Sequence, residues 1–170
     1  MSSPSAALEQ DEPRWLVDEM LGRLSRYLRF LGYDTEYVRG ASDDEIVVRA
    51  RRETRRLITR DRALSSQLTD SVLLTTTDIE GQVRQLREAL PSLRLEVRFD
   101  RCSICNGRLS PGGPLTYEPS RTTTVPPEVR AGSAPYFVCD SCGQLYWEGS
   151  HTREVRKRLS EWFREEPSFS

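Results

Sequence analysis

The stretch WLVDEMLGRLSRYLRFLG, residues 15–32, sets the pattern for the first half of the chain. Its first three residues are apolar and favour a short buried strand that ends at Asp18. Leucines then recur at helical spacing, and Gly32 suits a helix C-terminus. The leucines are Leu21, Leu24, Leu28 and Leu31, and the opposite face carries Arg23, Arg26 and Arg29. The stretch therefore predicts a strand followed by an amphipathic helix.

The same alternation of strand and helix continues to about residue 99. Further strands are predicted over 35–38, 57–59 and 72–75, with an edge strand over 93–99. A helix opens at Ser42, which has capping-box spacing to Glu45, and Thr77 has the same spacing to Glu80 before another helix. Strands separated by helices predict an α/β fold with a mainly parallel sheet flanked by helices.

Acidic residues follow several of the predicted strands. Sites in open parallel sheets form outside the carboxyl ends of the strands, so acids placed there can converge on one point. Mg²⁺ and Mn²⁺ prefer carboxylate oxygens, and such ions can activate water against a phosphodiester. The pattern predicts a catalytic site with Mg²⁺ or Mn²⁺. Its candidate residues are Asp18, Asp43, Asp44 and Asp61, with Asp78 as an additional acid.

Each of these acids also has a structural interpretation. An aspartate after a strand often caps the following helix. Asp43 and Asp44 suit the first turn of a helix, where the helix dipole favours negative charge. Asp78 lies inside the second capping-box pattern, which favours a structural role there. The residues alone leave both interpretations open.

Arginines lie beside the candidate acids. Arg23 and Arg26 on the first helix, and Arg60 and Arg62 beside Asp61, are candidates for contacts to RNA phosphates. An ordinary solvated helix face is the alternative for any one of them.

Four cysteines form two pairs with metal-ligand spacing. Cys102 and Cys105, and then Cys139 and Cys142, are separated by two residues each, which predicts a closed tetrahedral site for structural Zn²⁺. The gap between the pairs exceeds the usual ~15–20 residues, which indicates an inserted hairpin or loop containing Pro126 and Pro127. A dithiol redox pair is the alternative, although it usually needs only one such pair.

Three residues just beyond the second cysteine pair admit two roles each. Tyr146 and Trp147 could stack on bases, and His151, the only histidine, could contact RNA or transfer a proton. Packing under a small zinc module is the alternative role of the two aromatic residues, and a structural role is the alternative for His151.

Composition limits the class of protein. The 170 residues are 36% hydrophobic and 30% charged, with a net charge of −1, and no apolar run approaches the ~20 residues of a membrane-spanning helix. Residues 1–13 lack the basic residues and apolar core of a secretory signal, which predicts a cytoplasmic protein. The predicted organisation is a disordered tail over 1–13, an α/β nuclease domain over 14–99, a zinc ribbon over 100–150, and a terminal helix and tail over 151–170.

Several motifs together resemble the Mut-seven C-terminal RNase domain family. They are VDEMLGRL at 17–24, LGYDT at 31–35, DDE at 43–45, ITRDR at 58–62, both cysteine pairs and YWEGSH at 146–151. The resemblance covers about residues 14–158. It implies a PIN-like nuclease fold with a C-terminal zinc ribbon and a metal site on Asp18, Asp44 and Asp61. It also implies that Asp43 belongs to the same motif and that Thr59 supports the site.

We therefore predict a metal-dependent endoribonuclease that hydrolyses RNA phosphodiester bonds. RNA is its expected partner, with ribosome or tRNA among the candidates, and no membrane partner is expected. The alternative is a non-catalytic RNA- or ribosome-binding module that keeps the PIN-like fold and the structural zinc. A redox protein that uses the cysteines is a third hypothesis.

Overall fold

The computed structural model describes residues 12–112 and 126–164, which divide into two compact units. The first, here called the sheet unit, contains the chain up to Arg29 and Tyr33–Leu93. The second, here called the cysteine unit, contains Phe30–Gly32 and the chain from Arg94 onward. Within the described ranges, no helix is both long and apolar enough to cross a membrane.

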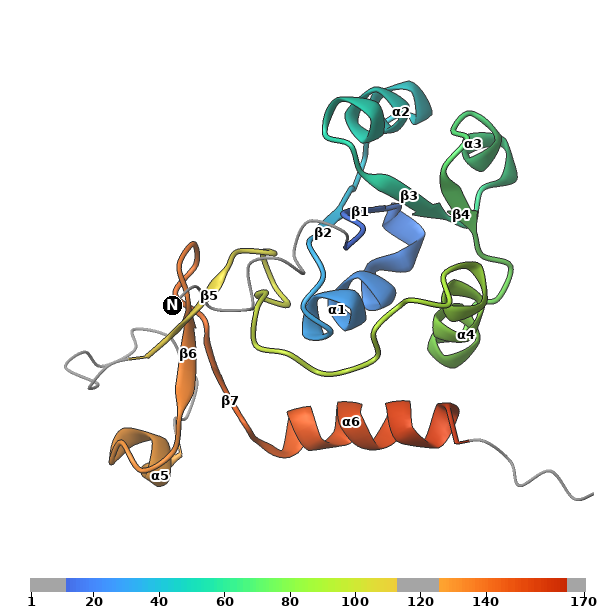
Figure 1. Ribbon diagram of the computed structural model, residues 1–170. Coiled ribbons are helices and arrows are strands. Elements are labelled where there is room, and N and C mark those ends of the chain that lie inside the picture. Colours follow the sequence, from blue (N-terminus) through green and yellow to red (C-terminus); the bar gives the residue numbers. More distant parts are fainter. Residues whose placement is uncertain (1–11, 113–125, 165–170) are drawn as a thin grey trace, which may run out of the picture. The chain divides into compact units, whose positions relative to one another are not determined.

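The sheet unit contains a four-stranded parallel sheet, as the sequence predicts (Figure 1). Its strands lie in the order β2-β1-β3-β4, and all three neighbouring pairs are parallel. They are β1 (Trp15–Val17), β2 (Thr35–Tyr37), β3 (Arg56–Thr59) and β4 (Ser71–Leu73). The helices are α1 (Gly22–Phe30), α2 (Asp43–Arg52), α3 (Arg62–Ser66) and α4 (Ile79–Ala89), and a 3-10 turn, η1 (Glu19–Leu21), precedes α1. The predicted α/β class is confirmed.

Helices cover both faces of this sheet, which explains why its strands read as continuous apolar runs. Figure 1 shows α2 and α3 over one face and α1 and α4 over the other. Leu16 and Leu57 are paired across β1 and β3 and belong to one cluster with apolar residues of α2 and α3. Successive strand residues point to opposite faces, so Val17 and Ile58, the next pair, face the other way and are fully buried.

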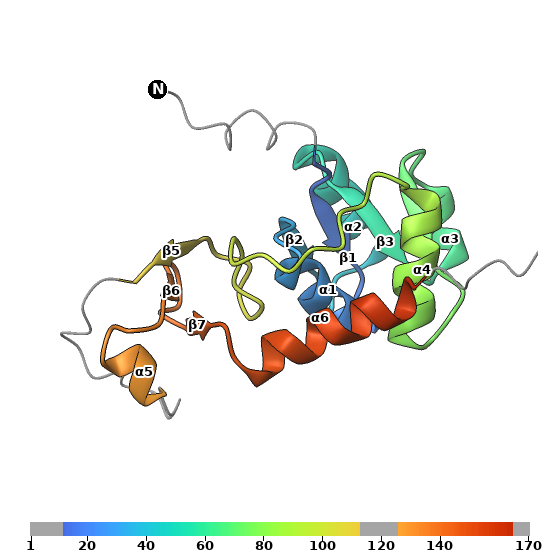
Figure 2. The ribbon, with the colours of Figure 1, turned by 60° about the horizontal axis from the view of Figure 1, so that its bottom comes forward.

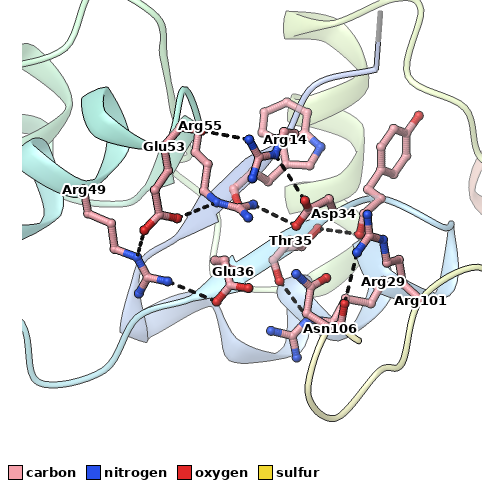
Figure 3. A network of polar contacts seen from close by, with 12 residues as sticks. Arg14, Arg29, Asp34, Thr35, Glu36, Arg49, Glu53, Arg55, Arg101 and Asn106 are labelled. Atoms are coloured by element: carbon pink, nitrogen blue, oxygen red, sulfur yellow. Dashed lines mark hydrogen bonds and ion pairs between the residues drawn. The ribbon is translucent and has the colours of Figure 1, made fainter. Parts of the chain in front are cut away.

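A network of ion pairs lies beside the amino-terminal ends of the strands (Figure 3). Arg55 is buried at its centre, with Nη1 2.8 Å from Asp34 Oδ1 and Nε 2.9 Å from Glu53 Oε2. Arg14 pairs with Asp34, and Arg49 pairs with Glu53. Burial alone would raise the pKa of Glu53, but hydrogen bonds from Arg55, Arg52 and Arg49 lower it to about 2.

Replacing Arg55 with alanine is expected to lower the free energy of unfolding by about 2 kcal/mol. The variant leaves two carboxylates without their buried partner, although Arg14 and Arg49 still compensate them in part. Arg52→Ala is the matched control, because Arg52 pairs with the same Glu53 but its side chain is 71% exposed. Urea denaturation measures both. Equal stabilities of the two variants would show that the buried pairs contribute no more than a surface pair does.

The cysteine unit contains a three-stranded antiparallel sheet in the order β5-β6-β7. The strands are β5 (Leu109–Pro111), β6 (Tyr136–Cys139) and β7 (Leu145–Trp147), and the helices are α5 (Pro127–Arg130) and α6 (Ser150–Trp162). In Figure 2 the chain runs from β7 directly into α6, the predicted terminal helix. Of the predicted insertion, Pro126 and Pro127 begin α5, whereas residues 113–125 lie outside the described residues. Among the described residues, one small apolar cluster of this unit buries Val129, Tyr136 and Leu145.

Three local predictions are wrong. Residues 93–99 form no strand, because the Arg98 amide bonds to the Phe30 carbonyl at a helix end, where no ladder can continue. Arg29 is buried and not on a solvated face, since its Nε donates to the Thr35 carbonyl at 2.9 Å. The N-cap of α4 is Asp78 and not Thr77, so the second capping box does not form.

Candidate active site and metal centre

The strand order reverses between β1 and β3. From β1 the chain passes through α1 to β2 on one side, and from β2 it returns through α2 to β3 on the other side. Open α/β sheets bind ligands in the crevice outside the carboxyl ends of the two strands at such a reversal. Asp18 directly follows β1, and Asp61 follows β3 after one intervening residue. Both residues therefore lie at the position where this fold type places its sites.

Asp18 and the residues after β3 are connected through one buried hydroxyl. Thr59 Oγ1 donates to Asp18 Oδ2 at 2.8 Å and accepts from the backbone amide of Asp61 at 2.9 Å. The other oxygen of Asp18, Oδ1, accepts from the Glu19 amide at 2.6 Å. Thr59 is fully buried and Asp18 is 7% exposed, so packing fixes the Asp18 carboxylate in one orientation.

Asp61 caps the helix that follows it and still has free acceptor capacity. Its Oδ1 accepts from the Leu64 amide at 3.0 Å, as an N-cap of α3. Among the described residues, none donates a hydrogen bond to its Oδ2, and the residue is exposed. A carboxylate has about four acceptor positions, so capping leaves most of them available.

Asp43 and Asp44 lie in the first turn of α2 and are exposed. Ser42 and Glu45 form the predicted capping box there, with Glu45 Oε2 accepting from the Ser42 amide at 2.7 Å. The same hydrogen bonds with Ser42 lower the pKa of Glu45. The helix end is thus capped by Ser42 and Glu45, which leaves the carboxylates of Asp43 and Asp44 without a capping bond. The positive end of the helix dipole can still stabilise both negative charges.

Asp78 has the structural role that its position suggested. It is the N-cap of α4, and its Oδ1 accepts from the Gly81 amide at 2.8 Å. It is exposed and lies five residues beyond the end of β4. In the described chain, no three carboxylates place oxygens within 4.8 Å of one another, so the five acids do not form a closed cage.

Charges around the candidate acids are unbalanced. Asp18 is a buried carboxylate, yet it forms no ion pair with any residue that the structure describes. Isolated buried charges are costly unless a cation or hydrogen bonds compensate them. The predicted phosphate-binding arginines Arg23, Arg26 and Arg62 are exposed, and Arg60 is half-buried. The Arg60 Nε has no hydrogen-bond partner in the part of the chain that the structure describes.

The four cysteines form a second, separate centre in the cysteine unit. Their sulfur atoms all lie within 4.8 Å of one another, and they are the only group of three or more potential metal ligands among the described residues. Cys102 Sγ is 3.7 Å from Cys142 Sγ, and Cys105 Sγ is 3.4 Å from Cys139 Sγ. Four sulfurs at 2.3 Å from a tetrahedral Zn²⁺ would be about 3.8 Å apart. The four cysteines could therefore hold a metal such as zinc.

Each cysteine pair is held by a similar tight turn. The Asn106 amide donates to the Cys102 carbonyl, and the Gly143 amide donates to the Cys139 carbonyl, both at 2.9 Å. Asn106 and Gly143 adopt positive φ values of 66° and 73°. In the first turn the residue in the left-handed conformation is Asn106, and Gly107 follows it. Asparagine tolerates this region better than most residues.

Burial and neighbouring cysteines raise the pKa values of Cys105 and Cys142. Burial, together with the neighbouring cysteines, raises the pKa of Cys105 to about 12, although a hydrogen bond from the Gly107 amide acts to lower it. Burial also acts to raise the pKa of Cys102, but hydrogen bonds with Tyr146 and with the amides of Cys105 and Ile104 lower it to about 7. A divalent cation would stabilise the four thiolates jointly, since the thiolate is the metal-binding form.

Gly107→Ala is expected to weaken zinc binding by about 10–100-fold, as changes next to metal ligands usually do. An added Cβ would lie 2.6 Å from Ser141 Oγ and 2.9 Å from Cys139 Sγ, so the two turns would have to separate. Gly132→Ala is the control, because it adds backbone strain at a φ of 71° but meets no atom within 4 Å. Competition with a chromogenic chelator measures both affinities. Equal zinc affinity in both variants would contradict the expected close approach.

Comparison with known proteins gives one match. The family model described as Mut7-C RNAse domain matches residues 13–159, which include both cysteine pairs and all five candidate acids. No protein of curated function and no solved structure matches the chain.

Proposed function

Because the chain belongs to the Mut7-C RNAse domain family, we propose that it is a metal-dependent endoribonuclease with a PIN-like nuclease domain. The reaction would be hydrolysis of RNA phosphodiester bonds. The observation that carries the proposal is the position of Asp18, which is a buried carboxylate that pairs with no cationic side chain among the described residues, at the point where the strand order reverses. A divalent cation bound there would compensate this charge.

Asp18 and Asp61 are the ligands that we propose for Mg²⁺ or Mn²⁺, together with Asp43 or Asp44. Their donor set is all oxygen, which fits these hard cations. When bound, such an ion activates water and stabilises the leaving oxygen of the phosphodiester. Thr59 would hold the Asp18 carboxylate in position through its buried hydrogen bond. Asp78 is a weaker candidate, because its carboxylate already caps α4.

The arginines near these acids would bind the RNA backbone. Arg23, Arg26 and Arg62 are exposed and form no ion pair with described residues, so their guanidinium groups are available to phosphates. Arg60 and Arg62 flank Asp61 in the sequence, which would bring phosphate-binding groups close to the proposed metal ligands. In the cysteine unit, we propose that Zn²⁺ is structural, since four cysteine ligands leave no open coordination position.

RNA cleavage by the purified protein in Mn²⁺ tests the proposal. Wild type is compared with Asp61→Asn, in which asparagine keeps the N-cap of α3 but removes the charge. Asp70→Asn is the control, because Asp70 is exposed and precedes β4 at the opposite edge of the sheet. We expect cleavage by wild type and the control, and a loss of more than about 100-fold in Asp61→Asn. Equal cleavage by all three proteins would refute the mechanism.

A second function, RNA binding without turnover, is favoured by one observation. Asp18, Asp61 and Asp78 each accept a hydrogen bond at the start of a helix, a purely structural role. This function predicts salt-dependent RNA binding, no cleavage in Mn²⁺, and weaker binding after arginine substitutions but not after aspartate substitutions.

A further inference from the structure

The cysteine unit contains a cavity that the function proposed so far does not use. Its volume is about 280 Å³, and it lies between the first cysteine turn, β7 and the start of α6. The residues that matter for its chemistry are Phe30, Ile104, Tyr146, Trp147 and His151. All of them belong to the cysteine unit.

Aromatic side chains form much of the wall, and two contacts fix them. The rings of Phe30 and His151 meet edge to face, with centroids 5.2 Å apart. The hydroxyl of Tyr146 accepts from the Ser103 amide at 3.0 Å and lies 3.1 Å from Cys102 Sγ. The Tyr146 ring is thereby anchored to the metal centre and held rigid. Stacking platforms for bases need rigid aromatic faces of this kind.

Apolar surface is left exposed beside these rings. Ile104 is 60% exposed, although it lines the cavity and is a large apolar residue. It lies between the two ligands of the first cysteine turn, so its backbone is fixed by that turn. A ligand with a flat apolar face would cover Ile104 and contact the aromatic wall at the same time.

Polar groups at the rim have no partner among the described residues. The His151 imidazole is exposed and makes no hydrogen bond in the described chain, and Trp147 Nε1, on a half-buried side chain, makes none there either. The N-cap of helix α6 is Gly149, so the amides at the start of the helix donate to no capping side chain. A ligand that fits the cavity would therefore combine a flat apolar face with hydrogen-bonding groups along its edge.

On the premise that the protein acts on RNA, we propose that this cavity binds one unpaired nucleobase of the substrate. Unstacked bases have both required features, since they stack on aromatic rings and form hydrogen bonds along their edges. The volume is near the lower end of ligand pockets, which fits one base and excludes a duplex. Arg153, two residues beyond His151, is exposed and forms no ion pair with described residues, so it can bind the adjoining phosphate.

The single histidine makes a direct test possible. The zinc-loaded protein has one set of imidazole C–H resonances, from His151, which can be followed by NMR during titration. We expect saturable shifts with the neutral nucleosides adenosine or uridine, and none with ribose 5-phosphate at the same concentrations. Shifts with ribose 5-phosphate alone would indicate an anion at the α6 terminus and overturn the proposal. Absence of any shift with the nucleosides would also overturn it.

Affinity for single-stranded RNA provides the second test, measured by fluorescence anisotropy without Mg²⁺ or Mn²⁺. We expect Ile104→Ala and His151→Ala to weaken binding by about 5- to 10-fold, at the low end of what loss of a stacked base costs. Val48→Ala is the matched control, because Val48 has the same 60% exposure but lies on α2. Equal affinity of Ile104→Ala, His151→Ala and the control would contradict base binding here.

These measurements separate this proposal from the nuclease proposal. Neither the NMR titration nor the anisotropy assay depends on cleavage. Nucleoside-induced shifts in a protein that never cleaves RNA would support the base pocket and argue against the enzyme. If the protein cleaves RNA in Mn²⁺ but its His151 resonances do not shift with nucleosides, the nuclease proposal is supported and the base-binding proposal is overturned.

Discussion

Asp18→Asn is expected to lower Mn²⁺-dependent RNA cleavage by more than about 100-fold, because losing a proposed metal ligand should cost more than the 10–100-fold that loss of a residue supporting a ligand costs. It is expected to change the stability of the metal-free protein by less than about 1 kcal/mol. Asparagine keeps the shape of the side chain and can still accept from the Glu19 amide and bond with Thr59. It removes a buried charge that forms no ion pair with a described residue. The two readouts therefore separate a metal ligand from a helix cap.

Metal-dependent stabilisation is the decisive control for Asp18. If the site binds Mn²⁺, wild type should gain about 2.7 kcal/mol at a Mn²⁺ concentration 100 times the dissociation constant, and Asp18→Asn should gain much less. Thermal melts of both proteins with and without Mn²⁺ measure this difference. An equal gain in both proteins, or none in wild type, would leave Asp18 as a helix cap only.

The sequence predicts the sheet unit well because the apolar runs of its strands and the helical spacing of its leucines are both clear patterns. β1 and β3 are short apolar runs buried on both faces, and α1 has leucines at helical spacing. The exception is the predicted strand over 93–99, where alternating residues bury Leu93 and Val97 without any strand pairing. An alternation of apolar and polar residues indicates which side chains are buried. A strand also needs a neighbouring strand whose backbone groups are free to form hydrogen bonds with it.

The site is predictable only in part, because its decisive contacts join residues far apart in the chain. Asp18 and Asp61 can be placed after strands from local pattern, but the hydrogen bond from Thr59 to Asp18 spans 41 residues. The burial of Arg55 likewise depends on Asp34, which lies 21 residues away in the chain. The cysteine centre was predictable because two local turns carry its ligands, and the spacing of the cysteines in the sequence is enough to identify such turns.

Loss of one cysteine ligand is expected to unfold the cysteine unit. Among the described residues, the buried apolar cluster beside its sheet consists of Val129, Tyr136 and Leu145, which is a small core for three short strands. Structural Zn²⁺ contributes about 10–16 kcal/mol of apparent binding free energy in small zinc modules, and that energy stabilises the folded state. In Cys139→Ser, we expect amide hydrogens of β6 and β7 to exchange within seconds, measured by mass spectrometry.

Ser141→Ala is the matched control for Cys139→Ser, because Ser141 lies in the same turn but supplies no ligand. It should keep zinc and slow exchange, since removing one exposed hydroxyl leaves all four sulfurs in place. The effect of Cys139→Ser should be largest in β6 and β7 and smallest in β1 and β3, whose core is independent of the metal. Slow exchange in β6 and β7 after loss of zinc would mean that packing alone holds this unit. The bound metal would then need a role other than stabilising the fold of this unit.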